Sequence, residues 1–306
     1  MGIIRNLATG EELVLEAHHL VGRSEHCTLR LSRPHVSAEH ASLSWDGAKW
    51  LVRDLGSTNR TFVDGKPLPS SGGVPVAAGQ SVAFGDVREA FVVIADEGPS
   101  TLAQPLHGGL ATHAENGLLA LPSGERPMLT IYRNTQGEWV MDTGGAIQPV
   151  LHRAVLEVDG MSYRLFLPEA RVETTPLASP VDRSVANIGL EFLVSRDEEH
   201  IELRTKVDAE IHDLGARAHN YLVLFLARRR LEDVEAGQPP PACGWVFQEE
   251  VCEALKVDPE RLNVDVYRVR RQFAAFDLAD PAEIIQRRPR TKQLRIGTAL
   301  CRVQGI

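Results

Sequence analysis

The chain has 306 residues, of which 43% are hydrophobic and 24% are charged, and this composition is typical of a soluble globular protein with two or three domains. Its formal net charge of -8 argues against bulk attraction to nucleic acid. The apolar runs are far shorter than the roughly 20 residues that a membrane helix needs, and the N-terminus lacks an apolar signal region. We therefore expect a cytoplasmic protein without a membrane partner.

Charge is distributed unevenly along the chain. Residues 260–306 hold ten Arg or Lys against five Asp or Glu, a net of +5, so the rest of the chain carries -13. A basic end on an acidic body indicates a localised anion-binding surface. The four cysteines (Cys27, Cys243, Cys252 and Cys301) show neither CxxC nor metal-binding spacing, so we expect free thiols in a reducing compartment and no metal site.

Residues 1–97 consist of short strand-like runs, such as 49–55 and 90–95, separated by Gly, Asp, Asn and Pro. This pattern predicts an all-β sandwich. Residues 98–116 lose the periodicity and are predicted to be a linker.

Three short motifs occur in order within the predicted sandwich. They are Gly22-Arg23-Ser24, Ser37-Ala38-Glu39-His40 and Gly56-Ser57-Thr58-Asn59-Arg60-Thr61, followed by Asp64-Gly65 and Phe84-Gly85. Together they resemble the forkhead-associated (FHA) family over residues 1–97. The resemblance implies that loops of an FHA sandwich bind phosphothreonine peptides.

The resemblance also implies roles for individual residues. Arg23 and Ser37 would bind the phosphate, which suits a planar guanidinium and a hydroxyl facing a group of about -1.5 to -2 charge. Thr58 and Asn59 would contact the peptide, and His40 would support the loops. Arg60 stands where the family often has Gly, so either the turn differs or Arg60 adds positive charge at the rim. The alternative is a degenerate FHA fold that no longer binds phosphate.

Residues 117–175 form a predicted small β-rich module with a hairpin turn at Asp159-Gly160. Asp142, within this module, is interpreted as part of a solvated turn. The module is either a spacer or a set of strands that packs on a neighbour. Residues 176–186 are predicted to be a second linker.

Residues 187–306 predict a hairpin, three helices and a closing hairpin. The helices are expected at about 215–233, 246–256 and 259–276, between hairpins at 189–206 and 284–297. In the third helix Leu262, Val266, Val269 and Phe273 lie on one face. Asp258 can cap it, Pro259 suits its first turn, and Tyr267, Arg268 and Arg271 are expected to point largely away from the apolar face.

This arrangement resembles the α+β winged-helix effector domain of OmpR-type response regulators over residues 189–303. The resemblance implies that the third helix enters a DNA major groove and that the closing hairpin contacts the backbone. The implied DNA-binding residues are Asn263, Tyr267, Arg268, Arg270 and Arg271 on the helix, and Arg287, Arg288, Arg290 and Lys292 on the hairpin.

No nucleophile elbow, P-loop, zinc-protease or dinucleotide motif occurs in the sequence, so we expect neither an enzyme nor a cofactor. The sequence predicts a bacterial-type signalling regulator that binds a phosphothreonine-containing partner or another copy of itself, and that binds double-stranded DNA to control transcription. Two alternatives stay open: a phosphorylation-dependent adaptor whose C-terminal domain makes only protein contacts, and a structural subunit of a larger machine. The kinase, the phosphopeptide, the DNA target and a homodimeric state are left undetermined.

Overall fold

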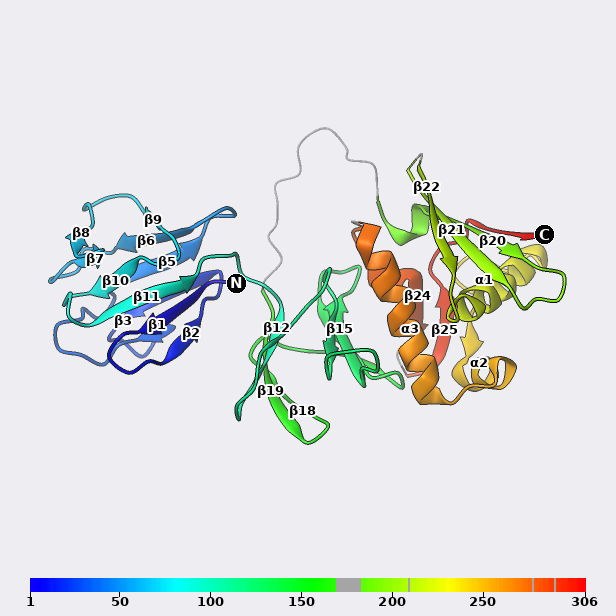
Figure 1. The fold of residues 1–306 in the computed structure, drawn as a ribbon, viewed down its shortest axis with the longest axis horizontal. Coiled ribbons are helices and arrows are strands. Elements are labelled where there is room, and N and C mark those ends of the chain that lie inside the picture. The colour runs from blue at the N-terminus through cyan, green and yellow to red at the C-terminus, as the bar shows by residue number, and fades with distance from the viewer. Residues whose placement is uncertain (169–182, 209, 277, 289) are drawn as a thin grey trace. The chain divides into compact units, whose positions relative to one another are not determined.

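The computed structural model describes residues 1–168, 183–208, 210–276, 278–288 and 290–306 (Figure 1). The chain divides into two compact units, residues 1–100 and residues 101–306. Within the described ranges, no helix is both long and apolar enough to cross a membrane. The predicted second linker, 176–186, lies mostly outside the described residues.

The first unit consists of a six-stranded and a five-stranded sheet, coloured blue to cyan in Figure 1. The first sheet has the order β2-β1-β11-β10-β7-β8, and the second has the order β4-β3-β5-β6-β9. The strand bounds are β1 Ile3–Asn6, β2 Glu12–Val14, β3 His18–Gly22, β4 Leu29–Arg30, β5 Ala41–Trp45, β6 Trp50–Asp54, β7 Thr61–Val63, β8 Lys66–Pro67, β9 Val74–Val76, β10 Ser81–Phe84 and β11 Ala90–Ala95.

Alternation along the strands builds the core of this unit. In β6, Trp50, Val52 and Asp54 are buried, while Leu51 and Arg53 point the other way, as the two-residue period of a strand requires. The core combines apolar side chains from both sheets, and Trp50 also donates its indole Nε1–H to the Glu97 carbonyl at 3.1 Å. The predicted all-β sandwich is therefore confirmed.

The second unit begins with two four-stranded sheets, which we call the middle module (residues 101–168). Their orders are β13-β12-β19-β18 and β14-β15-β16-β17. The bounds are β12 Leu102–Pro105, β13 Thr112–His113, β14 Leu119–Leu121, β15 Leu129–Arg133, β16 Trp139–Asp142, β17 Ile147–Pro149, β18 Val155–Val158 and β19 Met161–Phe166. The turn between β18 and β19 places Asp159 at φ 51° and Gly160 at φ 72°, which agrees with the predicted Asp-Gly hairpin.

The stretch 98–116 differs from the linker expected there, because it contributes β12 and β13 to the middle module. Leu102 and Ala103 are fully buried, and β12 pairs with β19. The short strands escaped detection because Gly108 and Gly109 separate them and neither strand exceeds four residues.

The C-terminal domain (residues 183–306, where described) contains two further sheets, a four-stranded sheet of order β22-β21-β20-β26 and a three-stranded sheet of order β23-β25-β24. Strand β26 runs parallel to β20. The bounds are β20 Gly189–Val194, β21 Ile201–Val207, β22 Glu210–Ala216, α1 Asn220–Glu235, β23 Val246–Phe247, α2 Gln248–Leu255, α3 Pro259–Phe273, β24 Ile285–Arg288, β25 Gln293–Ile296 and β26 Cys301–Gly305. Short 3-10 helices occupy Val185–Asn187, Ala274–Phe276 and Pro281–Ile284.

Helix α3 begins where its sequence predicts. The Asp258 side chain accepts the Arg261 backbone N–H at 2.7 Å, and Pro259 occupies the first turn. Leu262, Val266 and Val269 enter the core of the C-terminal domain. The middle module has a separate apolar core, and a small third cluster joins the two through Leu118, Tyr132, Val140, Ala274 and Ala282. The strands of the middle module thus pack on a neighbour.

Candidate functional site

The residues predicted to bind phosphopeptide lie in three loops of the sandwich. Arg23 follows β3, Ser37 lies between β4 and β5, and Thr58 to Arg60 lie between β6 and β7. The Arg23 backbone N–H donates to the Ser37 carbonyl at 2.9 Å, and the Thr58 backbone N–H donates to Ser37 Oγ at 3.2 Å. Ser37 therefore stands at the centre of the site, in contact with both other loops.

The Arg23 side chain lies over the Ser37 loop. Its Nε donates to the Val36 carbonyl at 3.3 Å, and the side chain is otherwise exposed. Among the described residues its two terminal nitrogens have no hydrogen-bond or ion-pair partner. The guanidinium edge is thus held beside Ser37 with donors left for an anion.

Gly22, just before Arg23, packs tightly on the same loop. A Cβ there would lie 2.3 Å from the Ala38 carbonyl oxygen, so the Gly-Arg motif requires a residue without a side chain at this position.

His40 joins two loops from beneath the site. Its ring is fully buried; Nδ1 accepts the Ser37 backbone N–H at 3.1 Å, and Nε2 lies 3.0 Å from the Arg60 carbonyl oxygen. Because Nδ1 acts as an acceptor, the neutral ring carries its proton on Nε2 and donates it to Arg60. Burial lowers the pKa of His40 below the ordinary 6.5, against the opposing effects of the Arg60 carbonyl and Asp54.

Asp54, at the end of β6, organises the loop that carries Thr58 to Arg60. Its two carboxylate oxygens accept four hydrogen bonds, from the Gly56 and Ser57 backbone N–H groups and from the Ser57 and Thr61 hydroxyls. Burial raises the pKa of this carboxyl, but the hydrogen bonds outweigh burial and hold the pKa below its usual value. Sequence reasoning missed Asp54, although a carboxylate two residues before a Gly-Ser turn is a signal for such a cap.

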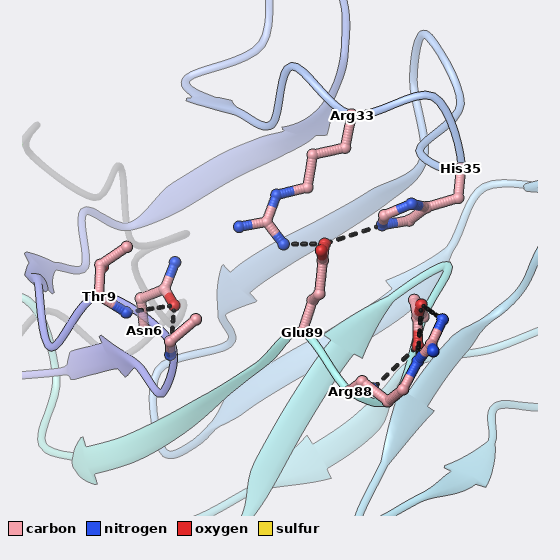
Figure 2. Close-up of polar contacts among 8 residues, drawn as sticks. Asn6, Thr9, Arg33, His35, Arg88 and Glu89 are labelled. Carbon is pink, nitrogen blue, oxygen red and sulfur yellow. Dashed lines mark hydrogen bonds and ion pairs between the residues drawn. The ribbon is translucent and has the colours of Figure 1, made fainter.

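Asn59 connects its loop to the one before β5. Its Nδ2 donates to the His35 carbonyl at 2.9 Å, so one amide hydrogen serves the protein itself rather than a peptide. Figure 2 shows how the His35 loop is anchored in turn: the His35 ring nitrogen Nε2 lies 3.0 Å from Glu89, and Arg33 pairs with the same carboxylate. Glu89 thereby anchors the loop whose His35 carbonyl accepts the hydrogen bond from Asn59. The sequence did not indicate a role for Glu89.

Arg60 keeps the turn that a glycine would adopt. Its φ is 67°, so the backbone conformation is retained with a side chain present, and the exposed guanidinium donates from Nη1 to Ser70 Oγ at 3.5 Å. Gly85, from the Phe84-Gly85 pair, donates its N–H to the Arg60 carbonyl at 2.9 Å. A Cβ on Gly85 would lie 2.4 Å from the His35 carbonyl oxygen. The site can therefore present the Arg23 guanidinium and the Ser37 hydroxyl to an anion.

In the C-terminal domain, the predicted DNA-binding residues of α3 do not share one exposed surface. Tyr267 and Arg270 are 7% and 1% exposed, and Asn263 lies against Gly144 of the middle module. The Tyr267 hydroxyl shows the same environment, since burial raises its pKa. The sequence predicts that Tyr267 points away from the apolar face of α3. This orientation does not expose Tyr267, because the middle module covers that side of the helix.

The remaining α3 arginines are paired at the rim of this contact. Arg268 Nη2 lies 3.7 Å from Glu125 Oε2, and Arg271 Nη1 lies 3.3 Å from Glu125 Oε1. Arg271 Nε also lies 3.4 Å from Glu115 Oε2.

Asp142 is the residue whose interpretation changes most. The sequence suggests a solvated turn, and this is wrong: the carboxylate is 3% exposed and lies 2.7 Å from Arg270 Nη1 and 3.2 Å from Arg287 Nε. Arg270 also donates to the Ala282 and Ile285 carbonyls at 2.8 Å each. Arg287 donates to the Gly144 carbonyl and, at 2.9 Å, to Asn263 Oδ1.

The other hairpin residues differ among themselves. Arg288 stacks on Trp245, with its guanidinium carbon 4.2 Å from the ring centroid. Arg290 and Lys292 are exposed at the tip between β24 and β25, and neither side chain has an ion-pair partner among the described residues. These two are the cations of the predicted set that remain available to a ligand.

An FHA domain occupies the N-terminal region, since the family model described as FHA domain matches residues 19–85. The chain is similar to the FHA domain-containing protein FhaB of Mycobacterium tuberculosis, with 41% identity over 69 residues that cover 22% of this chain and 44% of that protein. The protein of the same name from Mycolicibacterium smegmatis is 42% identical over 59 residues, 19% of this chain and 38% of that one. The match thus spans less than half the length of these curated relatives.

Solved FHA domains are also similar to part of this chain. The FhaA FHA domain, solved in complex with the intracellular domain of Rv3910, is 27% identical, with 30% of this chain and 99% of that chain covered and a TM-score of 0.27. The FHA domain of the CT664 protein from Chlamydia trachomatis is 25% identical, with 30% and 95% covered and a TM-score of 0.27.

The Gly85 contact can be tested against a matched glycine. Gly85 and Gly79 have φ of 85° and 88°, but a Cβ on Gly79 would meet no atom within 4 Å. Gly85→Ala should therefore destabilise the first unit by about 1–3 kcal/mol more than Gly79→Ala, because only Gly85→Ala overpacks a carbonyl. Urea unfolding of both variants measures the difference in unfolding free energy. Equal losses of stability would show that the His35 carbonyl can move away from the new methyl group at no cost.

The lowered pKa of His40 gives a second prediction. A buried neutral imidazole contributes stability that is fully present above the unfolded pKa of 6.5 and is lost as pH falls through the folded pKa. We expect the stability of the first unit to fall below pH 6.5, and to fall less steeply in His40→Asn. Hydrogen exchange of peptides from residues 1–100, measured in urea at several pH values, reports both slopes. Identical dependence of stability on pH in wild type and His40→Asn would contradict a contribution of the neutral His40 ring to the stability of the first unit.

Proposed function

We propose that the FHA domain of this chain binds phosphothreonine peptides and that Arg23 and Ser37 hold the phosphate. The observation that carries the proposal is the guanidinium edge of Arg23, held over the Ser37 loop by the Val36 carbonyl with its terminal donors unpaired among the described residues. A phosphate ester offers three strong acceptor oxygens, which fit these donors and the Ser37 hydroxyl.

The loop network supports recognition rather than catalysis. The side chains of His40 and Asp54 form hydrogen bonds with backbone groups and hydroxyls beneath the loops. Thr58, Asn59 and Arg60 lie exposed around Ser37, where a peptide backbone would pass. Hydrogen bonds that hold the loops before a ligand arrives reduce the conformational entropy lost on binding.

The phosphate assignment predicts a large loss of affinity on Arg23→Ala. Charge-assisted hydrogen bonds of about 1.5–3 kcal/mol correspond to roughly 10- to 150-fold weaker binding of a phosphothreonine peptide. Arg53→Ala, which removes an exposed arginine of the same sandwich, is the matched control and should bind as wild type does. Calorimetric titration with a phosphothreonine peptide library measures both, and the unphosphorylated library sets the background.

An Arg23→Ala variant that keeps wild-type affinity would overturn the assignment of the phosphate to Arg23, and a wild-type protein that binds neither library would favour a sandwich without phosphate binding.

For the C-terminal domain we propose a winged helix that binds double-stranded DNA, so that the chain acts as a transcription regulator responsive to Ser/Thr phosphorylation. A sheet followed by α1, α2, α3 and the β24–β25 hairpin is the expected order of elements. The exposed Arg290 and Lys292 at the hairpin tip supply cations for a phosphate backbone. The rival proposal is an adaptor in which the same surface contacts a protein.

Salt dependence separates the two proposals. If Arg290 and Lys292 each contact a phosphate, the double variant Arg290→Ala with Lys292→Ala should show a weaker salt dependence. The magnitude of the negative slope of log affinity against log salt concentration should decrease by about 2. Arg196→Ala with Lys206→Ala removes two exposed cations elsewhere in the domain and should leave the slope unchanged. Fluorescence anisotropy with mixed-sequence duplexes at several salt concentrations measures the slopes. Absent binding in every protein would favour the adaptor.

A further inference from the structure

The cations of α3 face an acidic edge of the middle module. Glu115, Glu125 and Asp142 are its carboxylates, and all three lie within 4 Å of arginines of the C-terminal domain. The arginines that they neutralise are Arg268, Arg270, Arg271 and Arg287, four of the residues predicted to bind DNA. The middle module therefore places negative charge where phosphates of a duplex would lie.

Asp142 forms the centre of this contact. Its carboxylate bridges Arg270 and Arg287, and all three side chains are nearly inaccessible to solvent. Tyr132 of β15 adds a ring beneath the Arg270 guanidinium, whose carbon lies 4.7 Å from the ring centroid. Burial alone would raise the pKa of Asp142, but the two guanidiniums and a hydrogen bond from the Gly144 backbone N–H together keep the pKa below its ordinary value. The ionised carboxylate is thus the stable partner of both arginines.

Each side of the contact has an apolar core of its own. The apolar core of the middle module and the core of the C-terminal domain share no residue, and only a small cluster joins them. Arg270 would keep its hydrogen bonds to Ala282 and Ile285 within the C-terminal domain. Loss of Asp142 would therefore release a pre-positioned cation rather than unfold the helix.

We propose that the β14–β17 sheet is an intramolecular cover of α3, that Asp142 is its latch, and that a DNA duplex competes with this sheet for the same arginines. This inference rests on the proposed binding of DNA. In the covered form, contact with a duplex is limited to the hairpin tip at Arg290 and Lys292. In the uncovered form, Arg268, Arg270 and Arg271 join the contact, and affinity and salt dependence both rise.

The test uses the full chain with Asp142→Asn, which removes the charge but keeps the shape of the side chain. A second variant, Glu115→Gln with Glu125→Gln, removes exposed rim charges and avoids the risk of disturbing buried structure. Its matched control, Glu138→Gln with Glu157→Gln, neutralises two exposed carboxylates of the same module that have no arginine partner among the described residues. Circular dichroism establishes that each variant is folded.

Two readouts are compared in every variant. Hydrogen exchange of the β16–β17 turn and of α3 reports whether the sheet has left the helix, independently of DNA. Anisotropy with a mixed-sequence duplex reports binding. We expect faster exchange and at least about tenfold tighter binding in Asp142→Asn, a smaller gain in Glu115→Gln with Glu125→Gln, and no change in the control.

The outcomes separate the cover from the DNA function. Unchanged exchange in both folded test variants would overturn the latch, whatever the DNA result. Faster exchange with duplex affinity equal to wild type would overturn the competition while leaving DNA binding in place. Faster exchange with no duplex binding in any protein would leave Asp142 as the latch and overturn both DNA binding and the competition.

Discussion

The geometry of the candidate phosphate site depends on one buried imidazole. His40 accepts a hydrogen bond from the Ser37 loop and donates one to the Arg60 carbonyl, so two loops from different strand pairs share a single ring. A buried polar group must be paired to be tolerated, and each nitrogen of the neutral ring finds its complement. Ser37 and the residues from Thr58 to Arg60 lie on the two loops that this ring joins, and Arg23 is bound to the Ser37 loop by its own hydrogen bonds.

The requirement that buried polar groups be paired also shapes the second unit. There the pairing occupies cations instead of leaving them available to a ligand. Arg270 is fully buried at the contact between α3 and the middle module, and its three donor groups must all be satisfied there. The Asp142 carboxylate accepts from Nη1 and supplies the opposite charge, and the Ala282 and Ile285 carbonyls accept from Nε and Nη2. A surface assigned to an external ligand on sequence grounds is therefore occupied by the chain itself in this conformation.

Much of the first unit could be predicted because its signals are local. The strands alternate, the turns use Gly and Asp, and the three motifs lie within a few residues of the strand ends. Helix α3 was predictable for the same reason, since Asp258 and Pro259 mark its start and its apolar spacing marks its buried face. The β12 and β13 strands were not, because two- and four-residue strands around a glycine pair carry little periodicity.

The sequence by itself determined which side chains could bind an anion, because charge and hydrogen-bonding capacity belong to the residue. It also located the FHA loops, because the three motifs that resemble the family lie in them. Only the tertiary structure decided which cations stay available: Asp142 and Arg270 lie 128 positions apart, and nothing in local periodicity indicates that they meet. Pairing over that separation depends on how the middle strands dock on α3, and this docking turns an apparently exposed acid into a buried partner.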